Sequence, residues 1–252
     1  MLGTMLIKAK IDSYGRGILV KAAKKELLKI EELKKSYKKG NEINVVIDKL
    51  NLSIYQEEIV CVFGRSGSGK TTLLNIIGTL DKPDSGKILL EGENPFLLSS
   101  SYLPAFRRKN IGFVFQYFNL VPYMSALENT AIPLKYEGIP KKKREKRAEE
   151  LLTRLGLKDR LNYKPGELSG GQIQRTAFAR AVINKPKIVL ADEPTGQLDL
   201  KTAKELADLI LQINKEERTT FIIATHDPVF DDIAHRTIFL EGGSFQTSTS
   251  NA

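Results

Sequence analysis

The chain contains little cysteine and histidine, and it has no long apolar run. Cys61 is the only cysteine among the 252 residues, which excludes a disulfide framework and a multi-thiolate metal site. The two histidines leave too few ligands for a zinc centre. No apolar run approaches the ~18 residues of a membrane span, and Lys8 interrupts the first apolar stretch too early for a signal peptide. We therefore expect an intracellular protein, with any membrane spanning left to another chain.

Most of the excess positive charge lies near the N-terminus. The net charge is +9, and residues 1–50 hold 12 Lys and Arg against 6 Asp and Glu, a net of +6. Such a charge permits an anionic partner, for example a nucleotide, a nucleic acid or an anionic lipid. Because the remaining residues are nearly balanced, we favour a lysine-rich solvated surface and expect no nucleic-acid partner.

The apolar patterning predicts strands that alternate with helices. Short β-branched or alternating runs predict strands at residues 45–54, 58–63, 87–90, 187–191 and 219–224. Apolar residues at helical spacing predict helices at residues 71–80, 141–156, 169–184 and 201–214. This alternation favours an α/β domain with a parallel sheet and crossover helices. Residues 25–36 favour a helix by propensity alone.

A glycine-rich loop lies between a predicted strand and a predicted helix. Residues 64–71 read GRSGSGKT and match the pattern G-x-x-x-x-G-K-[ST]. Glycines keep side chains away, so backbone N–H groups can surround a phosphate, and the following helix directs its N-terminal dipole at the anion. Lys70 is expected to reach the β- and γ-phosphates, and the Thr71 hydroxyl to bind Mg²⁺. The loop therefore predicts a nucleoside triphosphate site.

Two acids follow a second apolar run. Residues 188–191 predict a strand inside the sheet, so Asp192 and Glu193 emerge at its C-terminal end, where open α/β sheets bind ligands. Asp192 suits the Mg²⁺ shell. Glu193 is placed to orient or deprotonate an attacking water.

A third motif, LSGGQ, occupies residues 168–172. Ser169 is a candidate N-cap of the helix predicted at residues 169–184. With the N–H groups of Gly170 and Gly171, it is expected to form a second anion site at the start of that helix. Together the three motifs resemble those of the ATP-binding cassette (ABC) ATPases, and the resemblance covers about residues 25–244. It implies that the second site serves the γ-phosphate of ATP held by an opposite subunit. ATP would then join two copies of the chain head to tail.

The resemblance implies roles for further residues. Tyr37 would stack on adenine, and Gln116 would contact Mg²⁺ and the attacking water and lead into the segment that meets a membrane partner. Asp199 would communicate across the dimer, and His226 would contact the γ-phosphate, whereas His235 is expected to be structural. The expected catalytic residues are Glu193, His226, Lys70 and Gln116, and the expected metal ligands are Thr71, Gln116 and Asp192. The expected ATP-binding residues are Tyr37, Gly64, Ser66, Gly67, Ser68, Gly69, Lys70, Thr71, Thr72, Gln116, Asp192, Ser169, Gly170, Gly171, Gln172 and Asp199.

The same resemblance implies the fold and its division. We expect an α/β P-loop NTPase core with a RecA-like mixed sheet, an antiparallel β subdomain and an inserted α-helical subdomain at about residues 117–180. The resemblance places a strand at residues 27–34, in place of the helix that propensity favours. The nucleotide-binding domain would cover residues 25–244, after an N-terminal extension of unknown role at residues 1–24. Residues 245–252 are expected to form a polar, frayed tail.

Four positions depart from the family pattern. Arg65 stands where proline is common in the family. Glu57 stands where a turn glycine usually precedes the strand, so this turn is expected to be altered. Ile173 and Gln197 replace the more usual glutamine and asparagine. None of these changes removes a catalytic group.

Longer segments are similar to cassettes of the macrolide-exporter and lipoprotein-release type: GFVFQYFNLVPYMSALENTAIPL, KPGELSGGQIQR and ADEPTGQLD. This implies an ATPase that forms a homodimer with ATP and drives a separate permease from the cytoplasmic face of the cell membrane. Two alternatives remain. One is a cassette that regulates a membrane-bound cell-wall remodelling complex in cell division. The other, a soluble cassette acting on DNA or ribosomes, fits poorly because such chains carry two cassettes or a long coiled-coil insertion.

Overall fold

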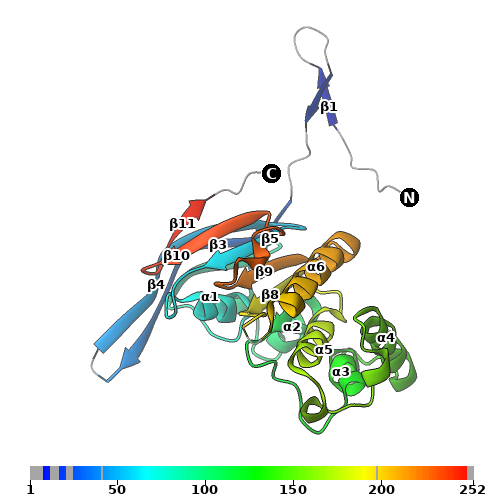
Figure 1. The fold of residues 1–252 in the computed structure, drawn as a ribbon. Coiled ribbons are helices and arrows are strands. Elements are labelled where there is room, and N and C mark those ends of the chain that lie inside the picture. Colours follow the sequence, from blue (N-terminus) through cyan, green and yellow to red (C-terminus); the bar gives the residue numbers. More distant parts are fainter. Residues whose placement is uncertain (1–7, 12–16, 21–24, 41, 197, 249–252) are drawn as a thin grey trace.

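A computed structural model describes residues 8–11, 17–20, 25–40, 42–196 and 198–248 (Figure 1). Its strands are β1 (Lys8–Ile11), β2 (Gly17–Val20), β3 (Glu26–Lys39), β4 (Glu42–Tyr55), β5 (Ile59–Phe63), β6 (Ser85–Leu90), β7 (Ile111–Val114), β8 (Ile188–Asp192), β9 (Thr220–Ala224), β10 (Arg236–Glu241) and β11 (Ser244–Ser248). Its α-helices are α1 (Lys70–Ile77), α2 (Leu103–Asn110), α3 (Ala126–Tyr136), α4 (Lys141–Arg154), α5 (Gly170–Val182) and α6 (Leu200–Glu217). Helices of the 3₁₀ type occur at Pro95–Leu97, Lys158–Arg160, Pro165–Glu167 and Pro228–Phe230.

The central sheet carries the strands that end at the predicted site. Its strand order is β11-β10-β5-β9-β8-β7, and every neighbouring pair is parallel except β10 with β11. Strands β5, β8 and β9 are almost entirely buried, as their continuous apolar runs require for strands covered on both faces. The predicted parallel sheet is therefore confirmed, and β5 and β8 end at the same edge of the sheet, with β9 between them.

A second, antiparallel sheet has the order β4-β3-β6 and includes the segment with helical propensity. The helix favoured by propensity at residues 25–36 is wrong, and the strand at 27–34 lies within β3. Strand β3 pairs on both edges, and Leu28, Ile30 and Leu33 are at most 2 % exposed. Pairing and burial outweigh an intrinsic preference of less than ~1 kcal/mol per residue. A register shift near Glu32, whose φ is 49°, bends the strand.

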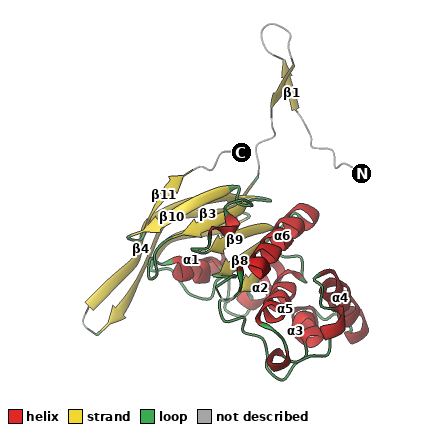
Figure 2. Cartoon of the chain, viewed as in Figure 1, coloured by secondary structure: helices red, strands yellow, loops and turns green. Residues whose placement is uncertain are grey.

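The helices cover both faces of the central sheet. Side chains that alternate along β5, β8 and β9 divide between two apolar cores, one with α1 and the antiparallel sheet and the other with α4, α5 and α6. Figure 2 shows α3, α4 and α5 gathered at one end of the molecule, away from the antiparallel sheet. This cluster lies within the segment expected to form a helical subdomain.

The ends of several elements differ from the sequence prediction. Helix α6 begins and ends slightly outside residues 201–214, and α4 stops before Gly156, whose φ is 73°. The frayed tail is wrong for residues 245–248, because β11 pairs with β10 in antiparallel register. Residues 249–252 lie outside the described part of the chain. Within the N-terminal extension, β1 and β2 pair with each other as an antiparallel hairpin.

Candidate functional site

The glycine-rich loop joins β5 to α1 in the predicted strand–loop–helix order. Gly69 precedes the helix with a φ of 101°, and Gly67 has a φ of 80°, so both occupy backbone conformations that favour glycine. A Cβ on Gly69 would lie 2.9 Å from Val46 Cγ1, and a Cβ on Gly64 would lie 2.6 Å from the Leu240 carbonyl oxygen. The loop is thus held between neighbouring strands, with no room for a side chain at Gly64 or Gly69.

A cavity of about 640 Å³ opens above this loop. It collects residues from the antiparallel sheet, the loop, the segment after β7, and the ends of β8 and β9. The residues that line it are Tyr37, Val46, Gly64, Arg65, Ser66, Gly67, Ser68, Gly69, Lys70, Thr71, Thr72, Gln116, Asp192, Glu193 and His226. The structure therefore brings together all the predicted site residues except the LSGGQ segment and Asp199.

Lys70 lies at the polar centre of the cavity. Its ammonium donates hydrogen bonds to the carbonyl oxygens of Gly64 (2.7 Å) and Arg65 (3.3 Å), and lies 3.8 Å from Glu193 Oε1. The other Glu193 oxygen, Oε2, lies 3.0 Å from Nδ1 of His226. Glu193 directly follows β8, and its N–H donates to the Ala224 carbonyl oxygen at 2.8 Å. A cation, a carboxylate and an imidazole thus meet where β8 and β9 end.

Asp192, at the end of β8, is partly buried in the wall of the cavity. Burial raises the pKa of Asp192 above its usual range, and a hydrogen bond with the Thr71 hydroxyl and the charge of Lys70 oppose this rise. Its Oδ1 atom is buried and has no hydrogen-bond partner within the described part of the chain. A free carboxylate oxygen beside a hydroxyl is a donor set that Mg²⁺ favours. The residues present therefore fit the metal ion predicted from sequence.

Tyr37 forms the wall of the cavity on the side of the antiparallel sheet. Its side chain is 42 % exposed, and its hydroxyl donates a 2.7 Å hydrogen bond to Asp81 Oδ2. The Lys35 ammonium lies 4.8 Å from the ring centroid and 2.9 Å from Asp81 Oδ1. Burial, followed by the bond to Asp81, raises the pKa of Tyr37. The ring is thus held in place while a large part of it remains accessible.

The LSGGQ segment lies outside this cavity. Ser169 caps α5 as predicted, since its hydroxyl accepts from the Gln172 N–H (3.4 Å) and Gln172 Oε1 accepts from the Ser169 N–H (3.0 Å). Asp199 caps α6 through the Thr202 N–H (3.0 Å), and these bonds lower the pKa of Asp199. A Cβ on Gly171 would lie 2.6 Å from Thr202 Cγ2, so the two capped ends are in close contact. Ser169 and Asp199 are both exposed.

Comparison with known proteins decides the family. The family model described as "ABC transporter" matches residues 47–196, which include the glycine-rich loop, the LSGGQ motif and the Asp192–Glu193 pair. This chain belongs to the ABC transporter family. It is an ATP-binding cassette of that family and an ATPase.

Relatives of the cassette include full-length subunits and larger proteins. It is 44 % identical to the uncharacterized ABC transporter ATP-binding protein YknY of Bacillus subtilis, over 89 % of this chain and 97 % of the relative. It is 42 % identical to the lipoprotein-releasing system ATP-binding protein LolD of Shewanella sp., over 90 % and 98 % of the two chains. It is 43 % identical to the macrolide export ATP-binding/permease protein MacB 1 of Yersinia pestis, over 89 % of this chain and 34 % of the relative.

Solved structures confirm the fold. The cassette is similar to MJ0796, described as a bacterial ABC transporter cassette in a dimeric structure, with a TM-score of 0.85, 41 % identity, and coverage of 90 % of this chain and 100 % of that one. A dimeric post-hydrolysis state of MJ0796 bound to ADP and Pi gives a TM-score of 0.83 and 40 % identity, with coverage of 89 % and 100 %. The predicted α/β fold of P-loop NTPase type is thus confirmed. Among the described helices, none has both the length and the apolarity of a membrane span.

Two departures from the family pattern have a structural outcome. Glu57 has a φ of 64°, so it adopts the left-handed conformation that a turn glycine would take, and its N–H donates to Thr220 Oγ1 at 2.9 Å. This conformation costs a residue with a side chain roughly 1–2 kcal/mol. Arg65 lines the cavity above the glycine-rich loop. Gln197 lies outside the described residues.

His235 is structural as expected, since its Nδ1 accepts from the Ile59 N–H at 3.0 Å.

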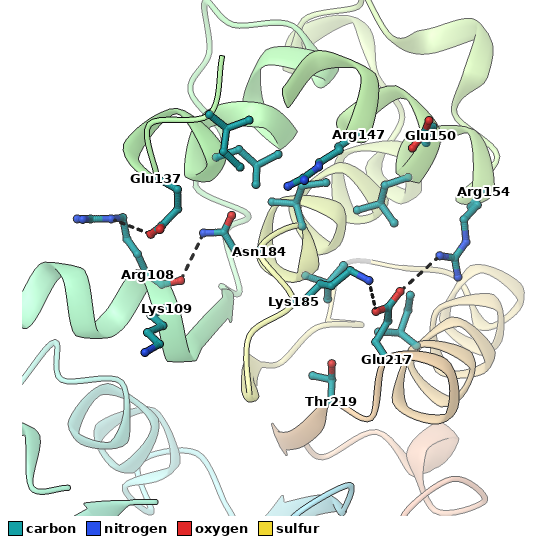
Figure 3. A pocket seen from close by; sticks show the side chains of 16 residues that line it. Arg108, Lys109, Glu137, Arg147, Glu150, Arg154, Asn184, Lys185, Glu217 and Thr219 are labelled. Carbon is teal, nitrogen blue, oxygen red and sulfur yellow. Dashed lines mark hydrogen bonds and ion pairs between the residues drawn. The ribbon is translucent and has the colours of Figure 1, made fainter. Parts of the chain in front are cut away.

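A second cavity, of about 780 Å³, is lined by residues of α3, α4 and α6 and of the segment after α5 (Figure 3). Ion pairs cross it at both ends. Arg108 Nε lies 3.4 Å from Glu137 Oε1 on one side, and Figure 3 shows Arg154 of α4 and Lys185 converging on Glu217 of α6 on the other. These ion pairs add charged links between the helical cluster and the core, beside the apolar core that α4, α5 and α6 share with the central sheet.

Proposed function

We propose that this chain is the ATP-hydrolysing subunit of an ABC transporter, and that it drives a separate membrane permease by ATP-dependent, head-to-tail homodimerisation. The proposal rests on one observation: the expected ATP-binding residues lie in two separate places on the chain. The loop, Asp192, Glu193 and His226 share one cavity, whereas the capped ends at Ser169 and Asp199 are exposed elsewhere. A second copy can supply its exposed Ser169 to a triphosphate held in the cavity. The dimeric structures of MJ0796 support this arrangement.

The residues of the cavity would act mainly by position and charge. The loop N–H groups and Lys70 would neutralise the transferred phosphoryl group, and Tyr37 would stack on adenine. Glu193 would orient the attacking water and accept its proton, while His226, 3.0 Å from Glu193, would contact the γ-phosphate. Asp192, Thr71 and Gln116 would hold Mg²⁺, which when bound neutralises phosphate charge. The partner copy's LSGGQ segment would close the site.

Substitution of Ser169 tests the contribution of the second copy. Ser169→Arg is expected to leave ATP binding to the monomer within about twofold and to lower turnover by about 10²-fold or more, as loss of a transition-state donor does. Calorimetry and a phosphate-release assay measure the two effects. Ser125→Arg is the matched control, because Ser125 caps α3 with the same kind of capping box but is not part of the LSGGQ motif. Normal turnover in Ser169→Arg would exclude a catalytic role for this segment.

A cleft beside Gln116 is suited to the membrane partner. It has a volume of about 320 Å³, and apolar and aromatic side chains dominate its lining, including Phe113, Phe115, Pro133 and Tyr136. Tyr136 is 64 % exposed there. We infer that a cytoplasmic segment of the permease docks in this cleft, close to the loop that carries Gln116.

Recovery from native membranes tests the docking cleft. Tyr136→Glu places a charge in the cleft and is expected to abolish co-purification with an integral membrane protein, while ATP hydrolysis by the isolated subunit stays within about twofold. Tyr102→Glu, at another exposed tyrosine, is the control and is expected to retain the partner. Undiminished recovery with Tyr136→Glu would place the permease elsewhere. The outer domain of the recovered protein would separate transport from regulation of cell-wall remodelling.

A further inference from the structure

Arg180 links two parts of the site that are far apart in the sequence. It lies in α5, the helix that begins after Ser169, at a distance of ~16 Å along the helix axis. Its guanidinium donates one hydrogen bond to the Phe118 carbonyl oxygen and one to the Asn119 carbonyl oxygen, each at 2.6 Å. Both acceptors lie just after Gln116 in the chain. One side chain of the LSGGQ helix thus holds the segment that carries a proposed ligand of Mg²⁺.

The segment after Gln116 has an unfavourable backbone conformation, which the hydrogen bonds from Arg180 can stabilise. Phe118 and Asn119 have φ values of 60° and 48°, which are uncommon for residues with a side chain. Two consecutive carbonyl groups in this conformation can point to the same donor, and the fork of a guanidinium matches them. Burial lowers the pKa of Arg180, yet the side chain remains a cation with its donors directed at these two oxygens. The pairing therefore stabilises this one conformation of the loop.

The segment before Gln116 is tied to the same helix. A Cβ on Gly112 of β7 would lie only 2.3 Å from the Ala181 carbonyl oxygen of α5. The backbones of the strand and the helix are therefore in direct contact. Strand β7 ends at Val114, two residues before Gln116. Gln116 thus lies in a short connection whose two ends both rest on neighbouring residues of α5, Ala181 and Arg180. Arg180 and Phe115 also line the cleft beside it.

We propose that Arg180 is a positioning residue that ties the position of Gln116 to that of α5. In the dimer, each subunit would contribute Ser169 to one ATP site and Gln116 to the other. Binding of Ser169 at the first site would then set the position of Gln116 at the second. This inference rests on the proposed function. Arg180 is not among the residues that line the cavity above the glycine-rich loop. Its action would be to transmit the position of a rigid helix to a loop, and the docking cleft adjoins the same contact.

The first experiment separates ATP binding from turnover in the full chain. Arg180→Met is expected to leave the Kd for ATP within about threefold and to lower kcat by about 10-fold or more, the effect of losing charge-assisted hydrogen bonds. Arg180→Lys keeps the charge but loses the fork, so we expect an intermediate kcat. Arg160→Met is the control, because Arg160 donates to a carbonyl oxygen of its own turn, that of Asp159, and is expected to retain kcat.

The second experiment detects the position of the loop directly. The chain contains no tryptophan, so Tyr117→Trp adds a single fluorophore next to Gln116, at a side chain that is 72 % exposed. We expect MgATP to change the emission of this reporter in the Arg180 background and to produce little change when Arg180→Met or Arg180→Lys is added. The reporter is used at saturating ATP, so that any difference reflects the loop and not occupancy.

The outcomes discriminate between positioning and general support of the fold. A kcat and a tryptophan response equal to those of the unsubstituted protein would overturn the proposal. A parallel loss of ATP affinity and kcat would also overturn it, because Arg180 would then support the whole site. If Arg180→Met fails to fold, Arg180→Lys tests the proposal instead, by its kcat relative to its Kd for ATP and by its tryptophan emission. If the reporter protein with Arg180 present neither binds nor hydrolyses ATP, the proposed function itself fails, which is a separate result.

Discussion

Glu193→Gln is expected to bind MgATP at least as tightly as the unsubstituted cassette and to hydrolyse it about 10²- to 10⁴-fold more slowly, the range for loss of a general base. Glu193 lies 3.8 Å from the Lys70 ammonium and 3.0 Å from His226. The amide keeps the size of the side chain but cannot accept a proton from water. It also removes a negative charge that opposes the γ-phosphate, so binding does not suffer.

The slow variant also tests the two-copy arrangement. If ATP joins two cassettes and its cleavage separates them, Glu193→Gln with MgATP is expected to elute as a dimer, and the protein without nucleotide to elute smaller. Single-turnover hydrolysis and size-exclusion chromatography measure the two properties on one sample. Glu149→Gln, on the exposed face of α4, is the control and is expected to behave as the unsubstituted protein. Monomeric elution of Glu193→Gln with ATP would count against the head-to-tail dimer.

Features that depend on neighbouring residues were predictable from the sequence. The glycine-rich loop, the cap at Ser169 and the acids after β8 are each set within a few residues of chain, and the structure has them where the motifs place them. The strand β3 shows the opposite case. Its residues favour a helix, and only pairing with β4 and β6, which lie later in the chain, makes it a strand. Resemblance to a family supplied that information, and local propensity could not.

Contacts between distant segments were missed for the same reason. Asp81, which fixes the Tyr37 hydroxyl, lies 44 residues away, and Arg180 lies 61 residues from Asn119. Neither residue belongs to a motif that the sequence analysis used. The pairing of β11 with β10 was also not predictable, because residues 244–248 are mostly polar, as expected for a tail. In each case the tertiary fold brings the partner near.

Lys70→Ala is expected to weaken MgATP binding by about 10- to 100-fold, the loss that follows when charge-assisted hydrogen bonds worth roughly 1.5–3 kcal/mol are removed. Lys70 is 9 % exposed, and its ammonium lies 3.8 Å from Glu193 Oε1. Without it, two carboxylates would face the triphosphate with less compensation. The loop carbonyls of Gly64 and Arg65 would also lose their donor, so the loop itself would become less ordered.

Calorimetric titration with MgATP measures this effect, and two further variants give it meaning. Lys87→Ala removes a charge from an exposed position on β6 and is expected to leave the affinity within about twofold. Lys70→Arg keeps the charge, but a guanidinium is larger and planar, and the buried position beside Gly64 suits an ammonium. We therefore expect Lys70→Arg to bind weakly as well, which would show that position and size matter in addition to charge. An unchanged affinity in Lys70→Ala would remove Lys70 from the phosphate site, and with it the argument that the cavity above the loop is where ATP binds.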